Sequence, residues 1–251
     1  MGCTQSNATA EKPAAKAADS EQKPRVFAIM RNGHDVIRGA QRDVKEMIEK
    51  DDLDGATELW EKHKKWMFLH MTMEEGTSKD GSPMGMFRLL NEKFDGIANN
   101  GKLAELHVIL HEKEEAVEEA FKAKDIAKLK EVFPPYDKIN LNHLVKEEEI
   151  MMPKVMEMQK AGENVKKLMR EELLDTVSGS PDFEFFVKFA NEMLDKHPEG
   201  QPRARVWDHA LWALATEEEW TVWDAWIKES LKPETYKELQ DAIEAFNATK
   251  K

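Results

Sequence analysis

Four long stretches with apolar residues at helical spacing constrain this chain more than any other feature. They cover about residues 26–50, 54–75, 102–123 and 125–152, with short turn-forming segments between most of them. Residues three and four apart share one face of a helix, so each stretch predicts a helix with an apolar side. Short connections place successive helices antiparallel. We therefore expect an all-α fold, with an up-down four-helix bundle over residues 26–160.

The ends of these helices are predicted from capping residues and prolines. We expect Asn32 and Asp54 to cap the first two helices, and residues 86–98 to form a short helix before the third. Proline lacks an amide hydrogen and clashes with the preceding turn. The pair Pro134–Pro135 should therefore break or bend the fourth helix, and Pro153 should end or kink it.

Residues 161–251 predict a C-terminal helical extension of a different kind. Prolines divide it into short helical pieces, and five of the seven tryptophans of the chain lie within it. Clustered tryptophans indicate the core of a compact helical subdomain. The alternative is an aromatic surface for a protein partner, because tryptophan is enriched at binding hot spots. That alternative surface would consist of Trp207, Trp220, Trp223 and Trp226.

Composition excludes several classes of function. A net charge of −12 argues against nucleic acid as a partner, since binding phosphates requires a basic surface. No run of 18 apolar residues is present to span a membrane, and residues 1–25 lack the apolar region of a secretory signal. The single cysteine, Cys3, rules out both a disulfide framework and a cysteine-based metal site.

The first 25 residues predict a disordered segment that carries lipid. Alanine, lysine, serine, glutamate and proline dominate it. Gly2 and Ser6 fit the pattern of N-myristoylation, and Cys3 offers a site for palmitate. Two acyl chains hold a protein stably on a bilayer. We expect a cytoplasmic protein anchored to the cytoplasmic face of a membrane; the alternative is a chance match to the pattern.

Candidate metal ligands occur on all four predicted helices. Residues four apart lie one turn apart on one helix face, where imidazole and carboxylate groups can bind one metal ion or two neighbouring ions. A core disfavours unpaired polar groups, so their joint presence indicates function. The candidates are His34, His70, Glu74, His107, His111, His143 and Glu147.

Other assignments of these residues are less favourable. Ferritin-like sites need a glutamate three residues before a histidine, and no histidine here has one. The His-Glu-x-x-His motif of zinc proteases is also absent. His63 lies two turns from His70 and is not expected to bind metal. Glu148 points away from His143 on a straight helix, so Glu147 is the preferred carboxylate.

The order of these motifs resembles the hemerythrin, or HHE cation-binding, family, whose members are four-helix bundles with a non-haem di-iron centre. His34–Arg38 is similar to the first motif of the family, and His143–Pro153 to the fourth; the likeness covers about residues 30–158. It implies two iron ions bridged by Glu74 and Glu147. Three histidines would bind one ion, namely His107, His111 and His143, and His34 and His70 would bind the other.

Three functions follow from this resemblance. The uneven number of histidines leaves an open position on one iron, so we expect a protein that binds or senses dioxygen, or iron, rather than an enzyme. The first alternative is a di-iron enzyme acting on peroxide, nitric oxide or ferrous iron, with Tyr136 as a candidate radical site two turns before His143. The second is a lipid-anchored scaffold.

Overall fold

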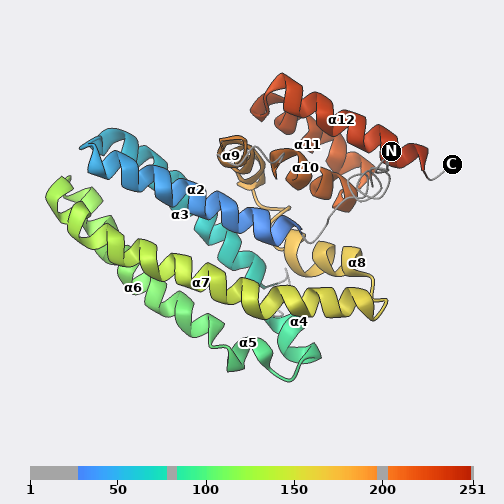
Figure 1. Ribbon diagram of the computed structural model, residues 1–251, viewed down its shortest axis with the longest axis horizontal. Helices are drawn as coiled ribbons and strands as arrows, with labels where there is room; N and C mark the ends of the chain where they lie inside the picture. Colours follow the sequence, from blue (N-terminus) through green and yellow to red (C-terminus); the bar gives the residue numbers. More distant parts are fainter. Residues whose placement is uncertain (1–27, 78–83, 197–202, 250–251) are drawn as a thin grey trace, which may run out of the picture.

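The computed structural model describes residues 28–77, 84–196 and 203–249, and helices joined by short turns make up most of them (Figure 1). These ranges contain eleven α-helices, one π-helical turn and no β-strand, which confirms the all-α prediction. None of the described helices combines the length and apolar character that crossing a bilayer requires. Gly2 and Cys3 lie outside the described residues, so the lipid anchor stays a prediction.

Two long helical hairpins form the first part of the chain. The first joins α2 (Ala28–Glu49) to α3 (Leu53–Glu75), and the second joins α6 (Leu103–Lys122) to α7 (Ile126–Lys160) (Figure 1). Asp52 caps α3 by accepting a hydrogen bond from the amide of the third residue beyond it, at 3.1 Å.

The predicted caps are therefore wrong. Asn32 is buried and lies inside α2, which already includes Ala28 one turn earlier. Asp54 is the second residue of α3 rather than its cap. A carboxylate two residues earlier, on Asp52, already satisfies the free amides at the start of the helix.

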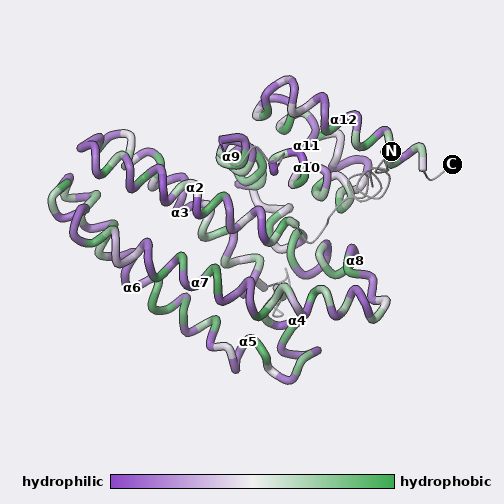
Figure 2. Tube along the Cα trace, in the orientation of Figure 1, coloured by the Kyte–Doolittle hydropathy of each residue, from purple (hydrophilic) through white to green (hydrophobic). Residues whose placement is uncertain are grey.

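The two hairpins pack through α2 and α7, which gives three sides of the expected bundle. On the fourth side, α3 and α6 line a groove of about 760 Å³. The closed up-down four-helix bundle therefore stays a prediction. Figure 2 shows polar and apolar residues alternating along the long helices, as helices with one buried side require.

Helix α7 continues through all three of its prolines, so it neither breaks at residues 134 and 135 nor ends at residue 153; the alternatives of a bend and a kink stay predictions. Pro134, Pro135 and Pro153 are all exposed. The carbonyl groups one turn before them, which lose a hydrogen-bond donor, belong to exposed residues and can bond to water instead. The helix can therefore tolerate these prolines.

Shorter helices connect and extend the hairpins. The expected helix over residues 86–98 is two helices, α4 (Met86–Lys93) and α5 (Ile97–Asn100). The C-terminal part is helical, as predicted. It contains α8 (Val165–Met169), the π-helical turn η1 (Arg170–Leu174), α9 (Phe183–Asp195), α10 (Arg203–Leu214), α11 (Glu217–Ser230) and α12 (Pro233–Ala248).

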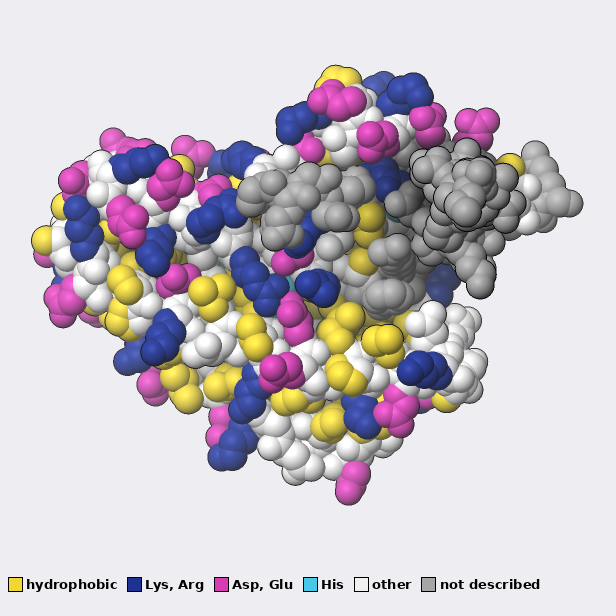
Figure 3. Space-filling model, in the orientation of Figure 1, with side chains coloured by type: hydrophobic (Ala, Val, Ile, Leu, Met, Phe, Trp, Pro, Cys, Tyr) yellow, Lys and Arg dark blue, Asp and Glu magenta, His cyan; other side chains and the backbone are white. Residues whose placement is uncertain are grey.

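The C-terminal helices share an apolar core with the hairpins. Trp66 of α3 stacks on Phe186 of α9, with ring centroids 4.4 Å apart, and also contacts Trp207 of α10. Trp207 and Trp223 are buried. These two side chains belong to the core, and a partner would reach only the half-buried Trp220 and Trp226 of the expected surface. On the face shown in Figure 3, side chains of both charges are interspersed.

Candidate metal centre

Six of the seven candidate ligands meet in the interior, where α2, α3, α6 and α7 each contribute at least one. They form two groups of four residues, and in each group the ligand atoms lie within 4.8 Å of one another. All six side chains are buried. Glu74 and Glu147 belong to both groups, which are completed by His34 and His70 in one and by His107 and His143 in the other.

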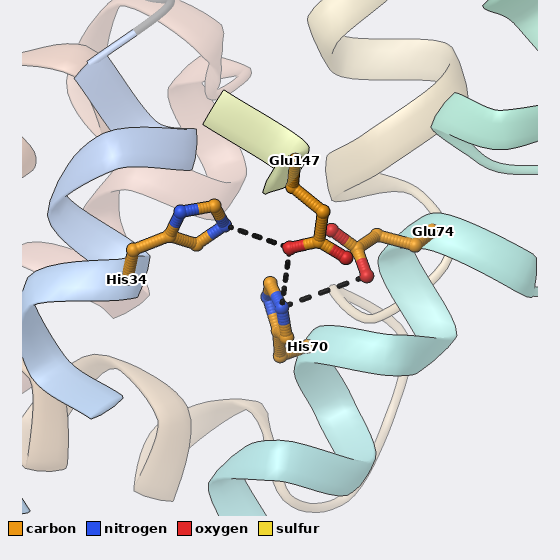
Figure 4. A group of neighbouring side chains, drawn as sticks. All are labelled: His34, His70, Glu74 and Glu147. Atoms are coloured by element: carbon orange, nitrogen blue, oxygen red, sulfur yellow. Dashed lines mark ion pairs between the residues drawn. The ribbon is translucent and has the colours of Figure 1, made fainter. Parts of the chain in front are cut away.

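The group containing His34 and His70 surrounds one oxygen of Glu147 (Figure 4). Glu147 Oε2 lies 3.4 Å from His34 Nε2 and 3.8 Å from His70 Nε2. His70 Nε2 also lies 3.5 Å from Glu74 Oε2, because the two residues are one turn apart on α3. Neighbouring ligand atoms on an octahedral ion with bonds of about 2.1 Å are separated by about 3 Å, so small adjustments would suit an ion.

The group containing His107 and His143 faces the other oxygen of Glu147. Glu147 Oε1 lies 2.5 Å from His143 Nε2 and 3.4 Å from His107 Nε2. Glu74 Oε2 lies 3.4 Å from His107 Nε2. The two oxygens of Glu147 thus point to different pairs of histidines, which is the arrangement of a carboxylate that bridges two ions.

Several atoms of this cluster have no hydrogen-bond partner among the described residues. They are Nε2 of His34, Nε2 of His70, Oε2 of Glu74 and both carboxylate oxygens of Glu147. An unsatisfied buried polar atom costs about 1–3 kcal/mol, and a charged one costs more. Cations between the nitrogen and oxygen atoms would satisfy all of them at once, so the residues fit a metal centre.

Three of the histidines have a polar partner at Nδ1, the ring nitrogen that faces away from the cluster. His34 Nδ1 lies 3.0 Å from Glu148 Oε1, and His143 Nδ1 lies 3.4 Å from Asn140 Oδ1. His107 Nδ1 contacts a carboxylate oxygen of Glu75. A partner at Nδ1 favours the tautomer that leaves Nε2 free to bind a metal ion.

Sequence reasoning missed these supporting residues or gave them another role. Helical spacing presents Glu148 only as an alternative ligand, and it gives Glu75 and Asn140 no role. The available signal was the carboxylate that directly follows each candidate bridge, Glu75 after Glu74 and Glu148 after Glu147.

The histidines favour the ionised form of Glu147. Burial raises the pKa of Glu147, but the nearby imidazoles of His107, His143 and His70 outweigh burial and hold the pKa well below its usual range. Burial likewise raises the pKa of Glu148, whereas His34 and Arg38 lower it to about 2. Ionised carboxylates are the form that binds a metal ion.

His107 shows that the cluster attracts positive charge. Burial lowers its pKa, yet the nearby carboxylates of Glu147, Glu74 and Glu75 outweigh burial and raise the pKa to about 12. A protonated imidazole supplies the cation that the carboxylates need. A metal ion would supply more positive charge and would displace that proton.

The two groups differ in their surroundings. His34, His70 and Glu74 line a cavity of about 10 Å³, enough for a molecule the size of water. The ring of Phe87 stacks on His107, with centroids 5.4 Å apart, and covers the other group. The rest of the cavity wall is mainly apolar and includes Ile29, Met30, Met73, Met86 and Leu173.

The structure corrects one expected ligand. The side chain of His111 is 69 % exposed and lies 3.4 Å from Glu114 and 3.8 Å from Glu115. It lines the groove between α3 and α6 rather than the interior. The spacing of His107 and His111 places both near one face of α6, but only the former reaches the interior.

Comparisons of the chain with family models, with curated protein sequences and with solved structures found no match.

Proposed function

We propose that this cluster binds two iron ions and that the protein binds dioxygen, or a similarly small ligand, at that centre. The observation that carries the proposal is the position of Glu147. Its two oxygens face different pairs of histidines, and neither oxygen has a hydrogen-bond partner. The resemblance of the motif order to hemerythrins agrees with iron as the metal.

The ligand atoms favour a transition metal of intermediate softness. Each ion would take two imidazole nitrogens and oxygens from Glu74 and Glu147. Nitrogen and carboxylate ligands suit iron, manganese or zinc, and the cluster offers no thiolate for copper(I). Glu148, Glu75 and Asn140 orient the histidines so that Nε2 faces inward.

The cavity supports a small and uncharged ligand. When bound, iron supplies open coordination positions and a reversible change of oxidation state. The residues of the chain decide what reaches it. His34 and His70 line the cavity, and the methionine and leucine side chains around them disfavour ions and large polar molecules. These limits favour a small uncharged molecule over ions and larger polar molecules.

The corrected ligand set favours a second candidate, an enzyme that reduces dioxygen or peroxide. Without His111, each ion receives two histidines rather than two and three. Both ions would then have open positions, and the unevenness that suggested a carrier is lost. Reversible binding and reduction are distinguished by what happens to the oxygen.

The test is an oxygen titration of the full chain loaded with ferrous iron in the absence of air. Reversible binding predicts a visible charge-transfer band that appears with oxygen and disappears when oxygen is removed. Reduction predicts oxygen uptake and a band that does not reverse. An iron-loaded protein whose spectrum and oxygen consumption equal those of iron in buffer would contradict both candidates.

A further inference from the structure

A line of buried polar contacts leads away from the metal ligand His143. Asn140 Oδ1 lies 3.4 Å from His143 Nδ1, and Asn140 Nδ2 donates to the hydroxyl of Tyr136 at 3.5 Å. That hydroxyl lies 2.8 Å from Nε2 of His63. None of these side chains is more than 1 % exposed. The proposed function assigns no role to Tyr136 or His63.

The amide of Asn140 sets the direction of these hydrogen bonds. Its nitrogen donates to the phenol oxygen of Tyr136, so the phenol proton is directed to His63. Its oxygen faces His143 Nδ1 and accepts the proton there, which leaves Nε2 of His143 for the metal.

His63 is placed to accept a proton. Burial lowers the pKa of its imidazole to about 3, so the ring is neutral near pH 7. The phenol proton directed at Nε2 selects the tautomer whose lone pair is on Nε2. Burial also raises the pKa of Tyr136 well above its usual range, so the phenol keeps its proton in the resting state. The pair therefore has a donor and an acceptor 2.8 Å apart.

The surroundings of Tyr136 exclude water. The ring of Trp60 meets it edge-on, with centroids 5.1 Å apart, and Phe133 packs at 5.8 Å. Tyr136 also lies seven residues before His143 on the unbroken helix α7, roughly 10 Å along the axis. A radical formed there would be close to the metal ions and shielded from solvent.

We propose that Tyr136 donates one electron to the metal centre as its phenol proton passes to His63. The inference rests on the proposed function, because it needs the metal ions, and it deepens that function by making the protein reduce the oxygen that it binds.

The step balances as follows. The O–H bond of Tyr136 breaks and an N–H bond forms on His63 Nε2, which leaves a neutral tyrosyl radical and an imidazolium. Reduction of dioxygen to two molecules of water takes four electrons and four protons. Two ferrous ions supply two electrons, Tyr136 supplies the third, and an external one-electron reductant such as a further ferrous ion in solution supplies the fourth. The protons that form water come from solvent.

The test uses the full chain loaded with two equivalents of ferrous iron, mixed with oxygenated buffer containing one further equivalent, and frozen within milliseconds to seconds. Electron paramagnetic resonance detects any tyrosyl radical. Tyr236 is the matched control, because it is the only other tyrosine in the sequence and its hydroxyl donates to Asp224. We expect a tyrosyl signal in the parent and in Tyr236→Phe, and at least a tenfold loss of that signal in Tyr136→Phe. His63→Gln should lower its yield.

Each other result overturns the inference in a recognisable way. A protein that binds iron and forms a reversible oxygen band without a radical leaves the proposed function standing and contradicts this inference. A signal that persists in Tyr136→Phe assigns the electron to another residue. A folded protein that binds no iron contradicts the proposed function itself. Circular dichroism and iron content of each variant separate these results from a failure to fold.

Discussion

His107 and His143 point their Nε2 atoms at each other across 2.8 Å, from two different helices. Only one proton fits between two nitrogens at that distance, so at most one of them acts as a donor. Each ring has a polar partner at Nδ1, which directs Nε2 inward. Two imidazoles held in this way, with Glu147 Oε1 near both, indicate ligands of one ion.

The two histidines of α6 should therefore respond differently to substitution. We expect His107→Ala to reduce the bound iron from two ions per chain to one or fewer, because its Nε2 lies within the cluster. His111→Ala should leave the iron content unchanged and alter the free energy of unfolding by less than about 0.5 kcal/mol, since the side chain is exposed. Iron content and urea unfolding measure both effects. Equal iron loss in the two variants would restore His111 to the ligand set.

Substitution of Glu148 tests the support of His34. The Glu148→Gln side chain keeps its shape but loses the charge that now contacts His34 Nδ1 and Arg38. We expect the affinity of the weaker-binding iron to fall by about 10- to 100-fold. Anaerobic titration of ferrous iron against a competing chelator measures it.

Glu149→Gln is the matched control for that variant. Glu149 is the neighbouring residue of α7 and is exposed. An equal loss of affinity in the two variants would show that net charge, rather than the contact with His34, is responsible.

The buried His63 predicts a pH dependence in the metal-free protein. Its pKa of about 3 lies below the ordinary value of 6.5, because burial disfavours the cation. The unfolded chain therefore binds a proton at this position that the folded chain does not bind. This stability is fully present above about pH 6.5 and is lost as the pH falls towards 3. Between pH 7.5 and 5.5 the loss should be about 1 kcal/mol.

Comparison of the parent with His63→Gln isolates the contribution of His63 to the pH dependence of the free energy of unfolding. His107 acts in the opposite direction, because its pKa is raised to about 12, and this stability is lost as the pH rises above about 6.5. Both proteins contain His107, so its effect cancels in the difference. Urea unfolding of both proteins at the two pH values, with a chelator present, measures this difference. An equal pH dependence in parent and variant would mean that His63 is not buried as a neutral ring.

The sequence predicts the cluster better than it predicts α7, the helix that carries two of the six ligands. Spacing of four residues was enough to place His70 with Glu74 and His143 with Glu147, because each pair needs only one continuous turn of helix. The same rule failed for His111. Whether a residue on the inner face of α6 is covered depends on the distance to α3, which is a tertiary property.

The prolines of α7 show another limit of local rules. Pro134 and Pro135 disfavour a helix interior, yet α7 passes through them, because the carbonyl groups without a donor belong to exposed residues and can bond to water. Burial of the apolar residues on the other face, such as Phe133 and Tyr136, outweighs the local cost. Helix propensity describes only the local cost of the prolines and not the gain from burial.

Replacement of one proline should therefore stabilise the protein. Pro135→Ala restores an amide that can donate to the carbonyl of Glu131, and we expect the free energy of unfolding to rise by about 1–3 kcal/mol. Pro233→Ala is the control, because that proline occupies the first position of α12, where proline is favoured. Thermal and urea unfolding measure both. No gain at position 135 would indicate that α7 is interrupted there.

The most direct test of the central claim compares the number of iron ions bound per chain in Glu147→Gln and in the parent protein. Both proteins are incubated with ferrous iron without air and freed of unbound metal, and iron per folded chain is counted. Because both oxygens of Glu147 face the cluster, we predict two ions in the parent and loss of both in the variant, with Glu149→Gln retaining two. A folded parent protein that binds no iron, or a Glu147→Gln protein that still binds two ions, would contradict a carboxylate-bridged two-metal centre.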